Sequence, residues 1–289
     1  MRFLDVKTDY AFKKVFGSSE SKDILISFLN SICEFHIVDL EIVDPYNIPM
    51  LKGMKDTFVD VKVKLDNGKT IIIEMQVLNH EGFEKRVLYN AAKNYSTQLD
   101  RNESYYLLNP VIAITITDFN MFETSKYITY FKLIEKEEFI EYSGDIELIF
   151  IELPKFKKDI KECKDIQDKW IYFIKNAGSL EYIPKSLDKE IQKALQIANE
   201  ANLTRDELEL QHKRKEFITI QKTAVSKAKK EGLKEGIKEG IKEGIKKGEM
   251  KKSVEIAKNL LKNGVDDEIV QTSTGLSKDE IDEIKQNLK

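Results

Sequence analysis

The stretch VDVKVKLDNGKTIIIEMQV, residues 59–77, predicts two β-strands joined by a turn. Two apolar-rich runs flank the segment Asp-Asn-Gly at 66–68. This segment fits a three-residue hairpin loop in which Gly68 takes the left-handed backbone conformation. With that loop, Asp60 on the first strand lies directly across from Glu74 on the second. A two-residue loop would shift the register by one residue and place these two acids on opposite faces of the sheet.

The register of this hairpin follows from its closing pair, Leu65 opposite Lys69, and it also places Lys62 across from Ile72. One face of the two strands then carries the apolar side chains of Val59, Val61, Val63, Leu65, Ile71, Ile73, Met75 and Val77. The other face carries Asp60, Glu74 and Gln76. Side chains that face each other across two strands have Cβ atoms about 5 Å apart, so two carboxylates there repel each other unless a positive group lies between them.

The acids on this hairpin have two interpretations. Polar residues on the outer face of a hairpin usually meet water, and periodicity alone favours that interpretation. The segment TIIIEMQVL at 70–78 is nearly all apolar, however, which predicts a strand buried on both faces. A buried acid is costly unless it is paired or bound to a metal. A hard divalent cation such as Mg²⁺ binds a few carboxylate oxygens and keeps water positions open, so it would suit this pair.

The rest of the first 180 residues mixes helices and strands. Thr8 or Asp9 can cap a first helix, and Gly17 ends it. Further helices are predicted within 22–33, 81–99 and 164–178, a strand before Pro45, and strands within 110–119, 125–135 and 145–156. This mixture predicts an α/β core.

Composition excludes several classes of protein. Charged residues make up 34% of the 289 residues, but the net charge is only −3, so bulk positive charge does not hold this chain on DNA. No apolar run approaches the roughly 18 residues of a membrane span, and the first residues lack the apolar core of a secretory signal. Two isolated cysteines form neither a disulfide framework nor a zinc motif, so a reducing cytoplasm is the simplest compartment.

The character of the chain changes after about residue 180. Glycines recur every four residues in KEGLKEGIKEGIKEGIKKGE, and Leu or Ile follows each of the first four. Each glycine inside a helix costs about 1 kcal/mol relative to alanine, so a lone helix is marginal. Small residues let two helices approach closely, which predicts a homo-oligomer through this repeat, and a flexible charged linker is the alternative. We expect a core at 1–180, a charged helical connector at 181–225, the repeat helix or linker at 226–250 and a small helical module at 251–289.

The C-terminal module has its own helix signals. Its helices are interrupted at 263–264 and again near 273–280, where Ser277 and Glu280 have the spacing of a capping box. The module could be a helix-turn-helix-like DNA-binding piece. Its many acids argue against a strong grip on phosphate, and a small interaction module is the alternative.

An aspartate on one strand, followed after a glycine turn by Glu-x-Gln on the next, resembles the PD-(D/E)xK nuclease superfamily. The ordered pieces TDYAFKKVFG, IIIEMQV, EKRVLYNAAKNYSTQL, PVIAITI and IELPKF narrow the resemblance to the bacterial Rpn group of recombination-promoting nucleases and transposases. The repeat and the tail also look typical of that group. The resemblance implies a restriction-endonuclease-like core, in which helices flank a mixed central sheet, followed by a C-terminal helical extension.

The same resemblance implies a metal-dependent DNA endonuclease. Asp60 and Glu74 would bind the cation, most simply Mg²⁺ and alternatively Mn²⁺ or Ca²⁺, with help from the Met75 backbone carbonyl. Gln76 would occupy the place of the lysine that positions the attacking water. Glutamine can donate a hydrogen bond but brings no positive charge, so catalysis would be slower or depend more on the metal.

Further candidates lie on the two nearest helices. Asp9 would add a carboxylate near the metal, and a role as helix N-cap is the alternative. Arg86, Tyr89 and Lys93 share one side of the helix after the hairpin and would contact DNA phosphates, with a solvated helix face as the alternative. For the whole chain, the alternatives to an endonuclease are a non-catalytic DNA- or protein-binding factor of a mobile element and a defence nuclease regulated by its tail.

Overall fold

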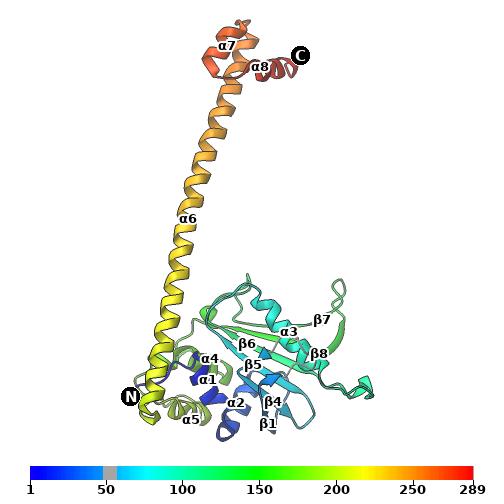
Figure 1. Ribbon diagram of the computed structural model, residues 1–289, viewed down its shortest axis with the longest axis vertical. Coiled ribbons are helices and arrows are strands. Elements are labelled where there is room, and N and C mark those ends of the chain that lie inside the picture. The colour runs from blue at the N-terminus through cyan, green and yellow to red at the C-terminus, as the bar shows by residue number, and fades with distance from the viewer. Residues whose placement is uncertain (48–56, 289) are drawn as a thin grey trace. The chain divides into compact units, whose positions relative to one another are not determined.

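A computed structural model of the protein describes residues 1–47 and 57–288 (Figure 1). The chain divides into two units, 1–221 and 222–289, and the described residues of each unit are considered by themselves.

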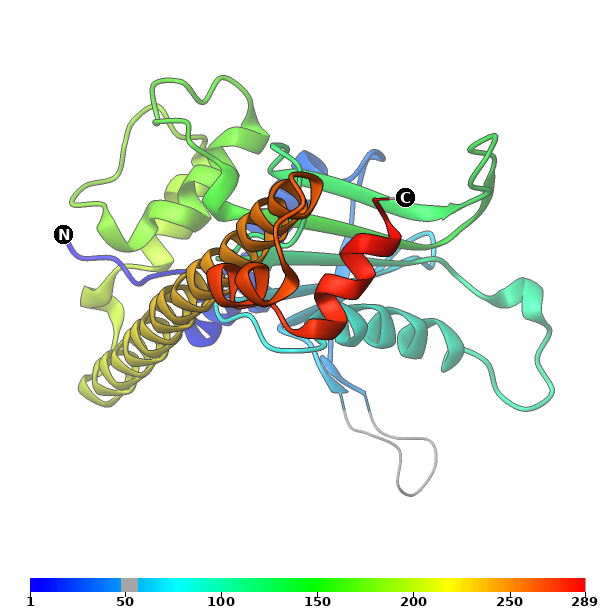
Figure 2. The ribbon, with the colours of Figure 1, turned by 90° about the horizontal axis from the view of Figure 1, so that it is seen from above.

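A mixed six-stranded sheet is the centre of the first unit. Its strands are β1 (Leu40–Val43), β4 (Val61–Leu65), β5 (Thr70–Gln76), β6 (Val111–Thr117), β7 (Ile128–Ile134) and β8 (Glu141–Glu152), in the order β1-β4-β5-β6-β8-β7. The pairs β5–β6 and β6–β8 are parallel, and the other pairs are antiparallel. A separate ladder joins β2 (Tyr46–Asn47) to β3 (Thr57–Phe58). Seen from above, the β7–β8 hairpin projects beyond the other strands (Figure 2). The predicted α/β core with a mixed sheet is confirmed.

The hairpin of β4 and β5 has the predicted register. Lys62 pairs with Ile72, and the Leu65 amide donates a hydrogen bond to the Lys69 carbonyl at 2.9 Å. Gly68 has a φ of +84°, and a Cβ added there would collide with the side chain of Asn109. The three-residue loop is therefore confirmed, and glycine is required in it for two independent reasons.

One residue of the predicted apolar face lies elsewhere. Val59 precedes β4 and packs in a cluster with Ile72, Ala91, Val111 and Ala113, which is the face opposite to that of Val61. The expectation for Val59 is wrong because strict alternation holds only inside the ladder, and the ladder begins at Val61.

Helices cover both faces of the sheet. The helices α1 (Asp9–Phe16), α2 (Lys22–Ile32), α4 (Ile166–Asn176) and α5 (Lys189–Ile197) share the larger core with the face that carries Ile71, Ile73 and Met75. The ring centroid of Trp170 lies 5.8 Å from that of Phe16 in this core. The helix α3 (Phe83–Ser96) packs on the other face, against Ile72 and Phe150. The strand β5 is thus buried on both sides, as the sequence predicts.

Short 3₁₀ turns connect these elements: η1 (Ser19–Ser21), η2 (Tyr105–Leu107), η3 (Leu153–Lys155), η4 (Ala177–Ser179) and η5 (Glu200–Asn202).

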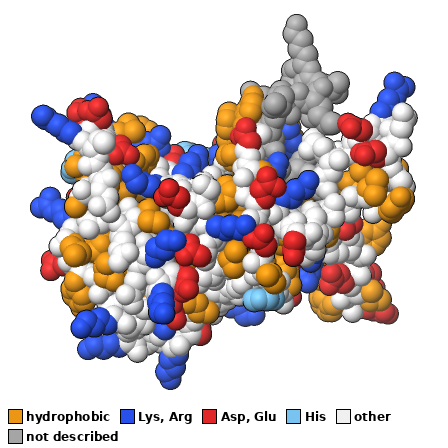
Figure 3. All heavy atoms as spheres, turned by 90° about the horizontal axis from the view of Figure 1, so that it is seen from below, with side chains coloured by type: hydrophobic (Ala, Val, Ile, Leu, Met, Phe, Trp, Pro, Cys, Tyr) orange, Lys and Arg blue, Asp and Glu red, His pale blue; other side chains and the backbone are white. Residues whose placement is uncertain are grey.

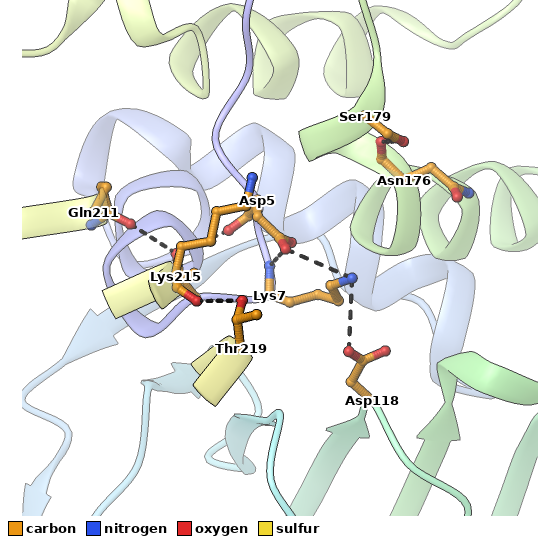
Figure 4. A network of polar contacts seen from close by, with 9 residues as sticks. Asp5, Lys7, Asp118, Asn176, Ser179, Gln211, Lys215 and Thr219 are labelled. Carbon is orange, nitrogen blue, oxygen red and sulfur yellow. Dashed lines mark hydrogen bonds and ion pairs between the residues drawn. The ribbon is translucent and has the colours of Figure 1, made fainter. Parts of the chain in front are cut away.

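The first turns of α6 (Arg205–Lys262) are fixed to the N-terminal segment of the first unit. The Thr8 hydroxyl donates a hydrogen bond to Gln211 Oε1 at 3.1 Å, and Arg214 Nη1 lies 2.7 Å from Asp9 Oδ2. Close by, Lys7 Nζ lies 3.8 Å from carboxylate oxygens of Asp5 and of Asp118, which follows β6 (Figure 4). The beginning of α6 therefore belongs to the first unit and not only to the extension.

The second unit contains the rest of α6, followed by α7 (Asp267–Thr274) and α8 (Lys278–Gln286). Its small core consists of Ala257, Val270, Leu276, Ile281 and Ile284. Ser277 and Glu280 form the predicted capping box at the start of α8. The residues 226–250 are helical, and the side chains of Leu233, Ile237, Ile241 and Ile245 are 55–64% exposed.

The surface mixes charges of both signs. On the face seen from below, Lys and Arg side chains lie among Asp and Glu side chains (Figure 3). Within residues 1–47 and 57–288, no helix combines the length and the apolar character needed to cross a membrane.

Candidate active site

Asp60 and Glu74 lie side by side where the β4–β5 hairpin opens away from its loop. Directly before the ladder begins at Val61, the Asp60 amide donates a hydrogen bond to the Ile73 carbonyl at 3.1 Å, so Asp60 lies opposite Glu74. The side chains of Asp60 and Glu74 are only 12% and 14% exposed. Asp60 Oδ2 also accepts a hydrogen bond from the Met75 amide at 2.8 Å. The predicted pairing therefore brings two mostly buried carboxylates together.

Basic side chains from two helices contact this acid pair. Lys13 on α1 places its Nζ 3.3 Å from Asp60 Oδ1. Arg86 on α3 forms an ion pair with Glu74 and donates a hydrogen bond to Gln76 Oε1 at 2.7 Å. The Gln76 amide nitrogen donates to the Leu78 carbonyl at 2.7 Å. The charge that Gln76 itself lacks is thus present beside it, on Arg86.

Burial shifts the titration of both acids. It raises the pKa of Glu74 to about 7, and the nearby carboxylates of Asp60 and Asp9 add to this shift, whereas Arg86 opposes it. Burial also raises the pKa of Asp60, against the lowering effect of the Met75 amide and Lys13. Asp9 raises the pKa of both Asp60 and Glu74, and Asp60 also raises that of Glu74, so the three acids form one electrostatic site.

Asp9 lies within electrostatic range of both acids but is more exposed. It is the first residue of α1, whose N-cap is Thr8, so the alternative role of Asp9 as N-cap is wrong. The side chain of Asp9 is 57% exposed and pairs with Arg214.

The three predicted phosphate contacts on α3 have different surroundings. Arg86 borders the acid pair with a side chain that is 42% exposed, and Tyr89 is 39% exposed. Lys93 is only 4% exposed, so the expectation of a surface lysine there is wrong. The reason is that Lys93 lies on the buried stripe of α3 together with Asn90 and Asn94.

A divalent cation fits the donors that are present. Among residues 1–47 and 57–288, no group of three or more His, Cys, Asp and Glu side chains could hold a metal ion. Asp60 and Glu74 alone would supply the side-chain oxygens, which suits Mg²⁺ because this ion commonly takes one or two carboxylates together with waters and substrate phosphates. Lys13 and Arg86 contact these same carboxylates, so a bound ion would compete with one ammonium and one guanidinium group.

Sequence reasoning missed three residues of the site: Lys13, Asn90 and Arg214. Lys13 follows Asp9 by four residues and Asn90 follows Arg86 by four, so the spacing of one helical turn could have found both. Asn90 is 2% exposed, and its side chain hydrogen-bonds Glu74. Arg214 has no such signal, because it lies far along the chain and only the folding of α6 onto α1 brings it to Asp9.

Comparison with protein families agrees with this geometry. Residues 6–228 match the model of the PD-(D/E)XK nuclease family transposases. The chain belongs to this family. Residues 251–286 match a second model, the C-terminal HTH domain of the Rpn/YhgA-like nuclease family. Comparison with curated proteins and with solved structures finds no match.

The two matches confirm the resemblance inferred from the hairpin and its ordered companions. As a PD-(D/E)XK nuclease family transposase, the chain has a nuclease-type core and an association with mobile elements. The C-terminal match decides between the two interpretations of the tail in favour of a helix-turn-helix, a DNA-binding motif, within α6, α7 and α8.

Proposed function

We propose that this chain is a metal-dependent endonuclease that hydrolyses DNA phosphodiesters in the recombination or movement of a mobile element. The observation that carries the proposal is the pair of buried carboxylates, Asp60 and Glu74, on adjacent strands of a chain in the PD-(D/E)XK family. Burying two acids beside each other raises their pKa values and costs free energy of folding, and binding a cation recovers that cost.

Each residue of the site has a distinct task in this proposal. Asp60 and Glu74 hold the divalent cation, most simply Mg²⁺, with Mn²⁺ and Ca²⁺ as alternatives, and the Met75 carbonyl assists them. When bound, such an ion lowers the pKa of water and neutralises charge on the phosphate. Gln76 orients the attacking water by hydrogen bonding, and Arg86 beside it supplies positive charge toward the phosphate.

DNA is the proposed partner of both units. Arg86 and the exposed Tyr89 meet phosphates near the scissile bond, and Asp9 adds a further carboxylate near the metal. The helix-turn-helix provides a second contact with DNA. Since the net charge is −3, binding relies on these local groups and not on bulk charge.

Plasmid cleavage tests this proposal. The parent is incubated with Mg²⁺, Mn²⁺ or Ca²⁺ beside Asp60→Ala, Glu74→Ala and the control Glu84→Ala, which removes an exposed acid from α3. We expect the two site variants to lose activity by about 10²-fold or more and the control to keep it. Site variants that fold and cleave as well as the parent would show that the assignment is wrong.

The alternative function is a non-catalytic DNA- or protein-binding factor with a silent nuclease fold. The observation in its favour is that Lys13 and Arg86 neutralise both acids without any ion. Calorimetry with Mn²⁺ separates the two functions. An endonuclease binds the ion and loses that binding in Glu74→Ala, whereas a silent fold shows no binding in either protein.

We also propose that the repeat at 226–250 joins two copies of the chain. Its support is an exposed apolar stripe next to glycines around which an added Cβ would meet nothing within 4 Å. Sedimentation of the parent beside the double variant Ile237→Lys/Ile241→Lys tests this proposal. A parent that is monomeric at all concentrations would contradict it.

A further inference from the structure

A cavity of about 410 Å³ adjoins the acid site on the side of Gln76. Its walls come from the end of β5, the loop that follows it, the start of α1 and the first turns of α6, all within residues 1–221. The lining includes Gln76, Leu78, His80, Arg214, Phe217 and Ile218. This volume falls in the range of pockets that hold small organic groups.

The walls combine an aromatic ring with apolar side chains and a basic rim. Phe217 is 57% exposed, and Ile218 and Leu78 are partly buried beside the same cavity. Lys213 and Arg214 lie on the same lining with His80 and with Asp9, which pairs with Arg214, whereas Lys213 pairs with Glu209. An exposed aromatic ring next to cations is the arrangement by which proteins stack an unpaired base and hold its phosphate.

The aromatic wall is held firmly relative to the acid site. Gln211 accepts a hydrogen bond from Thr8 at 3.1 Å, and Lys14 Nζ lies 3.2 Å from Glu207. Arg214 pairs with Asp9, one of the three acids that interact electrostatically. Phe217, which follows Arg214 by three residues on the same helix, is therefore positioned by α1.

The cavity and the acid site share residues, and this continuity points to the occupant. Gln76 and Met75 line the cavity, and the Met75 amide also hydrogen-bonds Asp60. A group bound in the cavity would therefore adjoin a phosphate bound at Asp60 and Glu74. An apolar segment of a partner protein would use Phe217 but would have no use for this link to the acids or for the basic rim.

We propose that this cavity receives one unpaired nucleotide of the DNA strand next to the scissile phosphate, with its base stacked on Phe217. The inference rests on the proposed nuclease function. It assigns a specificity-determining role to the first turns of α6, because the cavity favours single-stranded or distorted DNA over regular duplex. Stacking of a base on an aromatic side chain contributes enough to change affinity by about tenfold.

Fluorescence anisotropy with the full chain tests this proposal. The probes are a labelled single-stranded oligonucleotide and a duplex of the same sequence, both in EDTA so that no cleavage takes place. We expect Phe217→Ala to weaken binding of the single strand about tenfold and to leave binding of the duplex unchanged. The matched control is Ile220→Ala on the same helix, since Ile220 is 56% exposed, and it should bind both probes like the parent.

The possible outcomes separate this inference from the nuclease function. Phe217→Ala that binds the single strand like the parent, or that loses both probes equally, would overturn the inference, as would an equal loss in the control. Phe217→Trp, which keeps an aromatic face, should bind at least as tightly as the parent, and a fall as large as with alanine would also overturn it. Because binding is read without hydrolysis, absence of cleavage contradicts only the proposed function.

Discussion

Two buried glutamates in this protein have opposite surroundings. Glu152 on β8 is 0% exposed, and its Oε1 accepts hydrogen bonds from the amides of Met121 at 2.5 Å and Phe122 at 3.2 Å. Its Oε2 pairs with Lys155, whose side chain is 8% exposed. Glu74 on β5 instead faces other carboxylates, and its cationic partner, Arg86, is 42% exposed.

The difference separates an acid whose carboxylate stabilises the fold from one whose ionisation costs free energy. Around Glu152, donors and charge are arranged so that the carboxylate ties the loop after β6 to the sheet. Around Glu74, burial and like charges make ionisation costly, and perturbed acids of this kind are concentrated at functional sites. Replacing Glu152 should therefore lower the stability of the protein, whereas replacing Glu74 with a neutral residue should raise it.

The largest effect is expected for Glu152→Ala. It leaves the Lys155 ammonium and two backbone amides buried without the carboxylate, which should lower the free energy of unfolding by about 3–5 kcal/mol. Urea unfolding followed by the fluorescence of Trp170, the single tryptophan, reports on the first unit. A loss no larger than that of the surface control Glu84→Ala would show that Glu152 does not stabilise the fold.

Glu74→Gln should stabilise the protein, with a pH dependence of defined sign. The pKa of Glu74 is about 7 in the folded chain against an ordinary 4.5, so the folded state binds the proton more tightly. The parent therefore loses stability as pH rises from about 4.5 to 7, and at pH 8 the variant should be more stable by up to about 3 kcal/mol. The gain should shrink at pH 5. A gain of equal size at both pH values, or a loss, would contradict this assignment.

Arg86→Gln should have a smaller effect in the same site. Arg86 lowers the pKa of Glu74, so its removal raises that pKa further and destabilises the ionised form. Since the guanidinium is 42% exposed, solvent screens the pair, and we expect a loss of at most about 1 kcal/mol at pH 8 and almost none at pH 5. The double variant Arg86→Gln/Glu74→Gln should show no such pH dependence. A pH dependence that persists in the double variant would show that another acid causes the effect.

The smallest effect is expected for Lys13→Gln. The side chain of Lys13 is 48% exposed, so its ion pair with Asp60 contributes about 0.5 kcal/mol or less at low salt. Unfolding in 0.02 M and 0.5 M NaCl should show the difference from the parent disappear as salt rises. A large effect that is insensitive to salt would mean that Lys13 packs as part of the core.

Much of the site was predictable because local rules governed it. The turn residues at 66–68 set the register, and the period of two then placed Asp60 opposite Glu74. The apolar run of β5 predicted burial on both faces, and this burial raises the pKa of Glu74. These inferences needed only neighbours in sequence and one hairpin.

The errors arose where tertiary packing overrode a local pattern. Lys93 shares a helical side with Arg86, but α3 buries a polar stripe that includes Asn90 and Asn94, which hydropathy alone assigns to solvent. Arg214 came to the site through the docking of α6 on α1, a contact between segments about 200 residues apart that no periodicity reports.

The cost of ionising Glu74 has an evolutionary consequence. Replacement of this residue by a neutral one raises the free energy of unfolding. The acid would therefore be lost quickly by mutation in any lineage where selection for hydrolysis has ceased. Homologues with glutamine or leucine at the equivalent position would then be descendants that are more stable and do not hydrolyse DNA. An intact pair of acids, by contrast, would persist only in lineages where selection for what the pair binds outweighs the cost of ionising it.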